Sequence, residues 1–419
     1  MSRLGVAVVG CGGMAHSVHL PAIALLRDDL KLVAVCDREP VCAEETAARY
    51  GVRPYTDLER MLGEQDRIDF VVVTVHAQHH HTVAIEAARA GKHILVEKPI
   101  AVSLPCASAM LVACQKNMVK IEVAENYLRM PMDAFINEVI RSGALGPIRA
   151  VSVTDPVNGC SIDIGVHRHS QLREAAGGWP VAISAIMARP EIVRPEPSER
   201  FQEREFGDTC GVEWSVAMVD FDNGVAGKCE HLPLSKEALV WSGDLRTVIG
   251  DEGGVADDLW PNVWPWKSEG QLTVKRWRGH GGHEALGVRR TDTLIHGRAF
   301  AERIELEGTT PVVWENPALE QVKAAPSELF EAPCAHGRQT WADWFTAEVS
   351  IYKSFACAIR ENTAPWYGGD RGRNDLELTV ATYESARLGQ RLTLPLTAAT
   401  AHDLAFEEAF QRRYGRSIL

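Results

Sequence analysis

A glycine-rich turn near the N-terminus constrains the fold of this chain more than any other feature. An apolar, β-branched run at residues 6–9 leads directly into Gly10-Cys11-Gly12-Gly13-Met14-Ala15, which fits the pattern G-x-G-x-x-A. In this pattern Gly10 permits the tight turn, Gly12 lets backbone approach a pyrophosphate, and Ala15 allows close helix–strand packing. The N-terminus of the helix that follows would face the phosphates. The motif therefore predicts a dinucleotide-binding Rossmann unit at the start of the chain.

An acidic residue follows this motif at a distance that suits recognition of a ribose. Asp37 ends a second expected strand, 27 residues after Gly10, and its carboxylate can accept hydrogen bonds from both ribose hydroxyls. The same carboxylate would oppose a 2′-phosphate, so the sequence favours NAD over NADP. The neighbouring Arg38 leaves NADP open as the alternative, because its guanidinium could hold that phosphate.

Alternating strand and helix patterns predict a parallel, doubly wound sheet for residues 1–125. The expected strands are β-branched runs at residues 5–10, 31–36, 69–75 and 93–96, with helices expected at residues 41–50 and 82–90. At 419 residues the chain is too long for one ordinary core, so a second domain is expected over residues 126–419.

The second part of the chain has a different pattern, which predicts an α+β domain with a large, mostly antiparallel sheet. An expected helix at residues 132–141 is followed by strand-like runs at residues 148–153, 213–221 and 225–230. Asp222-Asn223-Gly224, between the last two runs, is a strong hairpin turn. Residues 251–340 are rich in Gly, Pro and Trp and poorly periodic, so we expect long loops over the sheet there.

Charge and cysteine usage narrow the class of protein. The net charge is −12 and no segment resembles a basic face, which argues against a nucleic-acid partner. No apolar run approaches the roughly 18 residues needed to span a bilayer, so no membrane association is expected. The ten cysteines are scattered without a C-x-x-C pair, which is typical of reduced thiols, and we expect a cytoplasmic location.

A second motif identifies the family that the chain resembles. Glu97-Lys98-Pro99 follows an expected strand, at the edge where parallel sheets bind ligands. Together with the glycine motif, this triplet makes the chain similar to the Gfo/Idh/MocA family of oxidoreductases. The resemblance continues through residues 90–99, Glu125-Asn126-Tyr127 with Pro131, the D-x-G-x-H element Asp163-Ile164-Gly165-Val166-His167, and the closing segments at residues 381–386 and 392–395.

The resemblance implies three catalytic residues. Lys98 would bridge the substrate hydroxyl and the nicotinamide region, where its charge favours a developing alkoxide. Asp163 and His167, four residues apart on one helical face, would flank the reacting carbon. His167 is the expected general base, because imidazole titrates near neutral pH. The expected cofactor contacts, from the motif and the resemblance together, are Gly10, Gly12, Gly13, Met14, Ala15, Asp37, Arg38, His80, Glu97 and Lys98.

The chain also departs from the family's pattern. Leu128 follows Tyr127 where the family often has arginine, and Ser170 stands where it often has aspartate. His169, two residues beyond His167, is either a second pocket group or simply exposed. The run His79-His80-His81 does not predict a metal site, because adjacent residues cannot converge on one ion and no carboxylate cluster accompanies them.

Two further features bear on the substrate. All eleven tryptophans lie after residue 178, where most would pack in the core and several could stack on sugar rings. A cationic, glycine-rich stretch between residues 275 and 290 is either a solvated or oligomer-contact surface, or a site for an anionic group. The candidate substrate residues are Tyr127, His169, Trp264, Arg276, His280 and His283.

Three functions are compatible with these residues. The first is an NAD-dependent oxidoreductase that transfers a hydride between nicotinamide and a hydroxyl of a sugar, cyclitol or sugar acid. The second is a redox-neutral glycoside hydrolase or lyase that oxidises its substrate transiently, including a sulfonated, carboxylated or phosphorylated one. The third is a non-catalytic sensor, against which the presence of Lys98, Asp163 and His167 argues. We expect a small carbohydrate-like substrate as partner, and a homo-oligomer, dimer or tetramer, formed through the C-terminal sheet.

Overall fold

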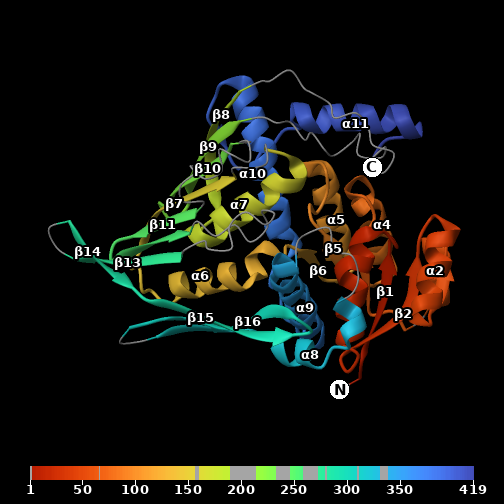
Figure 1. Ribbon diagram of the computed structural model, residues 1–419. Helices are drawn as coiled ribbons and strands as arrows, with labels where there is room; N and C mark the ends of the chain where they lie inside the picture. The colour runs from red at the N-terminus through yellow and green to blue at the C-terminus, as the bar shows by residue number, and fades with distance from the viewer. Residues whose placement is uncertain are drawn as a thin grey trace.

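The computed structural model describes residues 2–65, 67–155, 160–188, 214–232, 246–257, 272–278, 281–308, 311–330 and 338–419. These residues form a parallel sheet on one side of Figure 1 and a larger mixed sheet on the other, with helices between them. The expected fold class, a Rossmann sheet followed by an α+β domain with a mostly antiparallel sheet, is confirmed.

The N-terminal sheet has six parallel strands in the order β3-β2-β1-β4-β5-β6. Its strands are β1 (Leu4–Val9), β2 (Leu30–Cys36), β3 (Arg53–Tyr55), β4 (Phe70–Val73), β5 (His93–Glu97) and β6 (Ile121–Ala124). Every residue of β1, β4 and β6 is buried, as expected for a sheet that is covered on both faces. The strand order reverses between β1 and β4, so ligands are expected outside the carboxyl ends of these strands.

Helices join these strands, and local residue choices fix their ends. They are η1 (Ala15–His19, a π-helical turn), α1 (Leu20–Leu25), α2 (Pro40–Tyr50), α3 (Leu58–Glu64), η2 (Ala77–His79), α4 (His80–Arg89) and α5 (Leu104–Lys116). Gly51 closes α2 with φ of 66°, a backbone conformation that favours glycine. Ser103 begins α5, because its side chain accepts a hydrogen bond from the backbone N–H of Cys106.

The second sheet has nine strands in the order β14-β13-β12-β11-β7-β10-β9-β8-β18. They are β7 (Ile148–Asp155), β8 (Pro180–Met187), β9 (Ser215–Phe221), β10 (Ala226–His231), β11 (Arg246–Gly250), β12 (Gly253–Asp257), β13 (Leu272–Arg278), β14 (Gly282–Leu286) and β18 (Leu392–Thr393). Every neighbouring pair is antiparallel except β7 with β10. The expected hairpin turn joins β9 and β10, where Gly224 has φ of 83°.

The expectation of long loops over residues 251–340 is wrong for most of the part that the structure describes. This range contains β12, β13 and β14, and a further three-stranded sheet of β15 (Val288–Ile295), β16 (Arg298–Leu306) and β17 (Val312–Glu315). The β13–β14 and β15–β16 hairpins project from one side of the molecule (Figure 1), and most side chains of β14 and β15 are exposed or half-buried. Because water reaches both faces of such strands, they lack the apolar alternation that marks a half-buried strand.

C-terminal helices return to the N-terminal sheet and help to cover it. The second part contributes η3 (Tyr127–Arg129), α6 (Pro131–Arg141), α7 (Ile162–Ala176), α8 (Leu319–Lys323), η6 (Ser327–Phe330), α9 (Arg338–Arg360), α10 (Gly369–Leu388) and α11 (Ala401–Tyr414). Tyr352 and Phe355 of α9 share one buried cluster with Phe70, and Phe410 of α11 shares another with Val71. The two parts of the chain are therefore joined by common hydrophobic cores, and the division after residue 125 stays a prediction.

Candidate active site

The glycine loop has the geometry that a dinucleotide requires. Gly10 has φ of 100°, and a Cβ at this position would lie 2.6 Å from the carbonyl carbon of Thr74, so only glycine fits. At Gly12 and Gly13, by contrast, a Cβ would meet nothing within 4 Å, so the backbone faces open space. Ala15 is completely buried, in agreement with its expected role in close packing.

Asp37 is fixed beside this loop. One carboxylate oxygen accepts the backbone N–H of Cys11 at 2.7 Å, and the other accepts the N–H of Glu39 at 2.9 Å. These bonds hold the carboxylate at the end of β2, next to the glycine loop. Arg38 lies close to the carboxylate of Glu39, at 3.6 Å, and its side chain is 61% exposed.

A buried histidine connects the turn after the glycine loop to strand β5. His19, the last residue of η1, has Nε2 2.6 Å from Oε1 of Glu97, and Nδ1 2.9 Å from the hydroxyl of Tyr352 and 3.0 Å from Glu348. Burial opposes a charge on the imidazole, but the carboxylates of Glu348 and Glu97 outweigh it and raise the pKa of His19 to about 10. Glu97 thus contacts a histidine of the cofactor loop and accepts the N–H of Lys98 at 3.1 Å.

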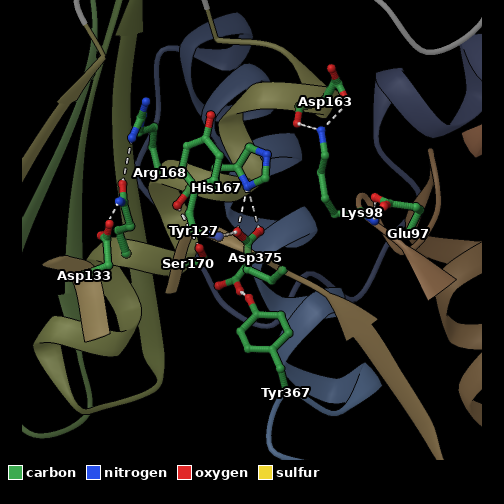
Figure 2. Close-up of polar contacts among 12 residues, drawn as sticks. Glu97, Lys98, Tyr127, Asp133, Asp163, His167, Arg168, Ser170, Tyr367 and Asp375 are labelled. Atoms are coloured by element: carbon green, nitrogen blue, oxygen red, sulfur yellow. Dashed lines mark hydrogen bonds and ion pairs between the residues drawn. The ribbon is translucent and has the colours of Figure 1, made fainter. Parts of the chain in front are cut away.

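Lys98 and Asp163 meet, as the resemblance implies. The ammonium Nζ lies 2.8 Å from Oδ1 of Asp163 and 3.3 Å from its backbone carbonyl oxygen. Lys98 comes directly after β5, and Asp163 lies in the first turn of α7, which begins where the Ser161 side chain accepts the N–H of Ile164. Burial disfavours the ammonium, but Asp163 more than offsets this and raises the pKa of Lys98. Figure 2 shows the pair bridging β5 and α7.

His167 has a partner that the sequence did not predict. Its Nδ1 lies 2.7 Å and 2.9 Å from the two carboxyl oxygens of Glu125, and the ring of Tyr127 stacks on the imidazole with centroids 3.8 Å apart (Figure 2). The backbone N–H of Tyr127 also donates to Glu125, at 3.1 Å. Glu125 follows β6 at the same edge of the sheet as Lys98 follows β5, and this position was the signal that could have identified it.

Burial shifts the pKa values of this pair in opposite directions. It raises the pKa of Glu125 to about 8, although the charge of Lys98 opposes the shift. It lowers the pKa of His167 well below its usual value, and Lys98 adds to this effect. Both shifts disfavour charge, so the imidazole is neutral near pH 7.

Two predicted histidines lie against backbone or another helix. His80 is buried, with Nδ1 2.9 Å from the carbonyl oxygen of Pro99 and Nε2 3.0 Å from that of Val75, so it supports the loop after Lys98. His169 is fully buried and contacts Thr379 of α10 at 2.8 Å. Two residues along a helix is a rotation of about 200°, which turns His169 away from the side of His167.

The other substrate candidates lie far from Lys98 or outside the described residues. Arg276 and His283 are on β13 and β14, at the outer edge of the second sheet, and Figure 1 has these strands on the opposite side of the molecule from β5. Trp264 and His280 fall outside the residues that the structure describes.

The residues present suit a bound dinucleotide. The open face of Gly12 and Gly13 could take the pyrophosphate, and the fixed carboxylate of Asp37 could take the ribose hydroxyls. Among the described residues, no group of three or more His, Cys, Asp or Glu side chains could hold a metal ion. None of the described helices has both the length and the apolar character of a membrane span.

Comparison with known proteins identifies the cofactor fold. Residues 4–125 match the Gfo/Idh/MocA family described as an oxidoreductase family with an NAD-binding Rossmann fold. D-apiose dehydrogenase of Paraburkholderia graminis is 31% identical over 147 residues, which are 35% of this chain and 38% of that protein. D-glucoside 3-dehydrogenase of Escherichia coli is 27% identical over 55% of this chain and 67% of its own length.

Solved structures extend the likeness in fold beyond the N-terminal domain. Levoglucosan dehydrogenase in complex with NADH and levoglucosan has a TM-score of 0.67 at 19% identity, over 94% of this chain and 100% of that one. In sequence, by contrast, the alignment with D-apiose dehydrogenase covers only 38% of the length of that protein. The N-terminal domain, residues 4–125, thus matches the Gfo/Idh/MocA family of oxidoreductases, whose NAD-binding Rossmann fold it shares.

Proposed function

We propose that this protein is an NAD-dependent dehydrogenase or reductase that acts on a hydroxyl or ketone of a sugar, cyclitol or sugar acid. The observation that supports this most directly is the 2.8 Å contact between Lys98 and Asp163. It brings the end of β5 and the first turn of α7 together at the ligand-binding edge of an NAD-binding sheet. A sensor has no need for an aligned ammonium, carboxylate and imidazole, which argues against the non-catalytic alternative.

Each of the three residues has a separate role in this proposal. The bound nicotinamide ring supplies the acceptor or donor of the hydride. Lys98 stays protonated, because its pKa is raised, and its charge stabilises the alkoxide that develops as the hydroxyl loses its proton. His167 takes that proton, and Asp163 holds the ammonium in place through the 2.8 Å contact.

Asp37 supports NAD over NADP in this proposal. Both of its oxygens already accept backbone N–H groups, so the carboxylate is held in place beside the ribose position. A 2′-phosphate placed there would face this charge at short range. The ion pair of Arg38 with Glu39 reduces the attraction that the arginine could offer.

Relatives support the carbohydrate part of the proposal. The names of three matching proteins describe dehydrogenases of D-apiose, levoglucosan and D-glucosides. The cationic stretch gives little support to an anionic substrate, because Arg278 is paired with Glu284 and Arg289 with Glu305 on exposed strands. Neutral sugars and cyclitols are therefore the first substrates to test.

The test is a panel of sugars, cyclitols, sugar acids and glycosides, monitored at once for nicotinamide absorbance and for released product. We expect stoichiometric NADH with at least one neutral sugar or cyclitol, and we expect Lys98→Met to abolish it. A panel on which the wild-type protein binds NAD but reduces none of it, in either direction, would contradict the proposal.

A redox-neutral glycoside hydrolase or lyase is the second candidate. The observation that favours it is the presence of two separate proton-holding pairs, Lys98 with Asp163 and Glu125 with His167. Oxidation of one hydroxyl requires a single base, whereas elimination beside the new ketone requires a further proton transfer. Because Lys98 stays protonated, it could only donate in that step, to the departing oxygen, while His167 acts as the base.

Two further parts of the proposal concern assembly and location. We infer a homo-oligomer through the second sheet, because the exposed residues Ile186, Met218 and Ile249 lie on the face opposite its core, and they are 65%, 50% and 43% exposed. We also infer a reducing compartment such as the cytoplasm, since the eight described cysteines are all free thiols.

A further inference from the structure

The contact between Glu125 and His167 carries an inference that rests on the proposed dehydrogenase function and deepens it. We propose that Glu125 is the positioning residue of the general base, and that it shares a proton with His167 and selects the imidazole nitrogen that faces the substrate. Glu125 would not touch the substrate. It would act through His167, from the end of the neighbouring strand.

The geometry leaves the imidazole one orientation. Nδ1 is held by both carboxyl oxygens, at 2.7 Å and 2.9 Å, and the Tyr127 ring lies parallel to the imidazole within 5°. His167 and Glu125 are each about 2% exposed, so no solvent competes for Nδ1. Figure 2 shows the other ring nitrogen, Nε2, on the side of Asp163 and Lys98. The contact therefore points Nε2 toward the residues that bind the reacting hydroxyl.

The carboxyl group is itself fixed from several elements. The loop after β6 contributes the N–H of Tyr127, which donates to Oε1 at 3.1 Å. The charged and titratable groups that act on Glu125 are Lys98 and Glu97 at the end of β5, Tyr127 beside it, His167, Arg168 and Arg173 on α7, and Asp375 on α10. Asp375 is held in turn by both Arg173 and Tyr367, so its charge is largely neutralised.

The number of protons on the pair decides what His167 can do. Burial raises the pKa of Glu125 to about 8. Below this pH the carboxyl O–H donates to Nδ1, so Nε2 carries the imidazole hydrogen and can only donate. When the pair loses one proton, Glu125 becomes a carboxylate, Nδ1 carries the hydrogen, and Nε2 presents a lone pair. Only this second state can accept the proton of a substrate hydroxyl.

This arrangement gives the two directions of the reaction opposite pH dependences. In oxidation the substrate O–H proton moves to Nε2, and the carboxylate of Glu125 stabilises the resulting imidazolium. In reduction a pair that already carries the extra proton must donate it to the ketone oxygen. Oxidation should thus rise and reduction should fall as the pH passes through about 8.

The kinetic test uses Glu125→Gln and Glu125→Asp. Because an amide can donate to Nδ1 and hold the unreactive tautomer, Glu125→Gln should lower kcat for oxidation by about 10²-fold or more, with little change in KM. The rise in oxidation rate at about pH 8 should disappear from the pH profile of this variant. Glu125→Asp keeps a carboxyl group and should recover part of the loss. A Glu125→Gln enzyme with the wild-type kcat and the wild-type pH profile would overturn the inference.

Glu122→Gln is the matched control. Glu122 is another buried carboxyl on β6, three residues earlier, and it contacts Arg129 and Ser354 instead of His167. Its pKa is also raised by burial, to about 7. Glu122→Gln should keep the change in rate at about pH 8. This result would show that loss of a buried carboxyl on β6 does not by itself remove the pH dependence, and that the contact with His167 is required.

A second readout needs no substrate or cofactor. Proton and nitrogen magnetic resonance of isotope-labelled histidine, with His167→Asn used for assignment, reports which imidazole nitrogen carries the hydrogen. We expect the His167 hydrogen on Nε2 below about pH 8 and on Nδ1 above it, and on Nε2 at every pH in Glu125→Gln. If the same imidazole nitrogen carries the hydrogen at every pH, in both the wild type and Glu125→Gln, the inference is contradicted. If the sugar panel instead shows no redox activity, the proposed function fails while this measurement still decides on the pair.

Discussion

The Nε2 atom of His19 lies 2.6 Å from Oε1 of Glu97, which ties the helical turn after the glycine loop to the strand that leads into Lys98. The same imidazole reaches Glu348 and Tyr352 of α9 through Nδ1. A single fully buried histidine thus joins the turn after the glycine loop, strand β5 and a helix of the second part of the chain. Movement of one of these elements would disturb the other two.

His19→Gln should destabilise the protein, and the loss should depend on pH. Removing the cation leaves two buried carboxylates without their partner, which costs about 3–5 kcal/mol in comparable cases. The folded-state pKa of His19, about 10, is above its ordinary value of 6.5, so its stabilisation is complete below pH 6.5. It is lost as the pH rises through about 10, where the folded histidine also becomes neutral. Thermal unfolding across this range measures the difference between the two proteins.

The control for that measurement is His16→Gln, in the same turn. His16 contacts Thr46 at 3.0 Å, and burial lowers its pKa. A lowered pKa affects stability only at acidic pH, so the difference from wild type should stay constant from neutral to alkaline pH. If the His19→Gln difference also stays constant there, the buried imidazolium is not what holds the three elements together.

Lys98→Met should abolish turnover while nicotinamide cofactor binding remains. The substitution removes the cation at the alkoxide position but none of the glycine-loop contacts, so a loss of about 10²-fold or more in kcat is expected. Cofactor binding by calorimetry and turnover on the best substrate of the panel are the two measurements. Lys116→Met, at an exposed position of α5, is the control and should behave as wild type. Near-normal turnover of Lys98→Met would show that Lys98 is not a catalytic residue.

Some of the site could be predicted from sequence because its signals are local. Asp163 and His167 are four residues apart, and one helix is enough to place them on the same face. Lys98 comes directly after a strand, and parallel strands end at a common edge. The family resemblance selects these three residues, and the geometry of one helix and of the sheet edge is enough to place them.

The remaining contacts depend on packing between distant segments. His167 and Glu125 are 42 residues apart, and His19 and Glu97 are 78 apart, so no spacing rule links either pair. Strand β15 also could not be predicted, because most of its side chains are exposed or half-buried and leave no periodic signal. Which residues contact each other in these cases depends on how distant segments pack in the folded core. A pattern within a short stretch of sequence does not contain that information.

Asp37→Ala should narrow the preference of the protein for NAD over NADP. The wild-type carboxylate accepts two backbone N–H groups and remains beside the ribose position, where a 2′-phosphate would be repelled. Calorimetric titration with both cofactors measures the ratio of the two Kd values for each protein. Equal affinities in the wild type would instead assign cofactor choice to Arg38.

Charge placed on the outer face of the second sheet should dissociate the protein. Met218 and Ile249 are 50% and 43% exposed on β9 and β11, on the opposite side of the sheet from the core residues Val219 and Val248. Met218→Lys with Ile249→Lys should shift a dimer or tetramer to monomer in sedimentation velocity. Leu294→Lys, on the β15 hairpin and 76% exposed, is the control and should leave the assembly unchanged. A monomeric wild-type protein would rule out assembly through this face.

Deuterium incorporation distinguishes the two candidate activities. If a ring hydroxyl is oxidised transiently, the C–H beside the new ketone becomes acidic, and His167, held by Glu125, can remove its proton once it has released the hydroxyl proton to water. The bond to the group one carbon further along then breaks, water adds to the resulting enone, and the ketone is reduced again by the hydride taken at the start. No net oxidant is consumed, so trace NAD should suffice for many turnovers of a chromogenic glycoside. In heavy water, sustained release of the aglycone with deuterium beside the oxidised carbon would support the hydrolase. NADH that accumulates in proportion to substrate, with the glycosidic bond intact, would leave the dehydrogenase as the activity of this site.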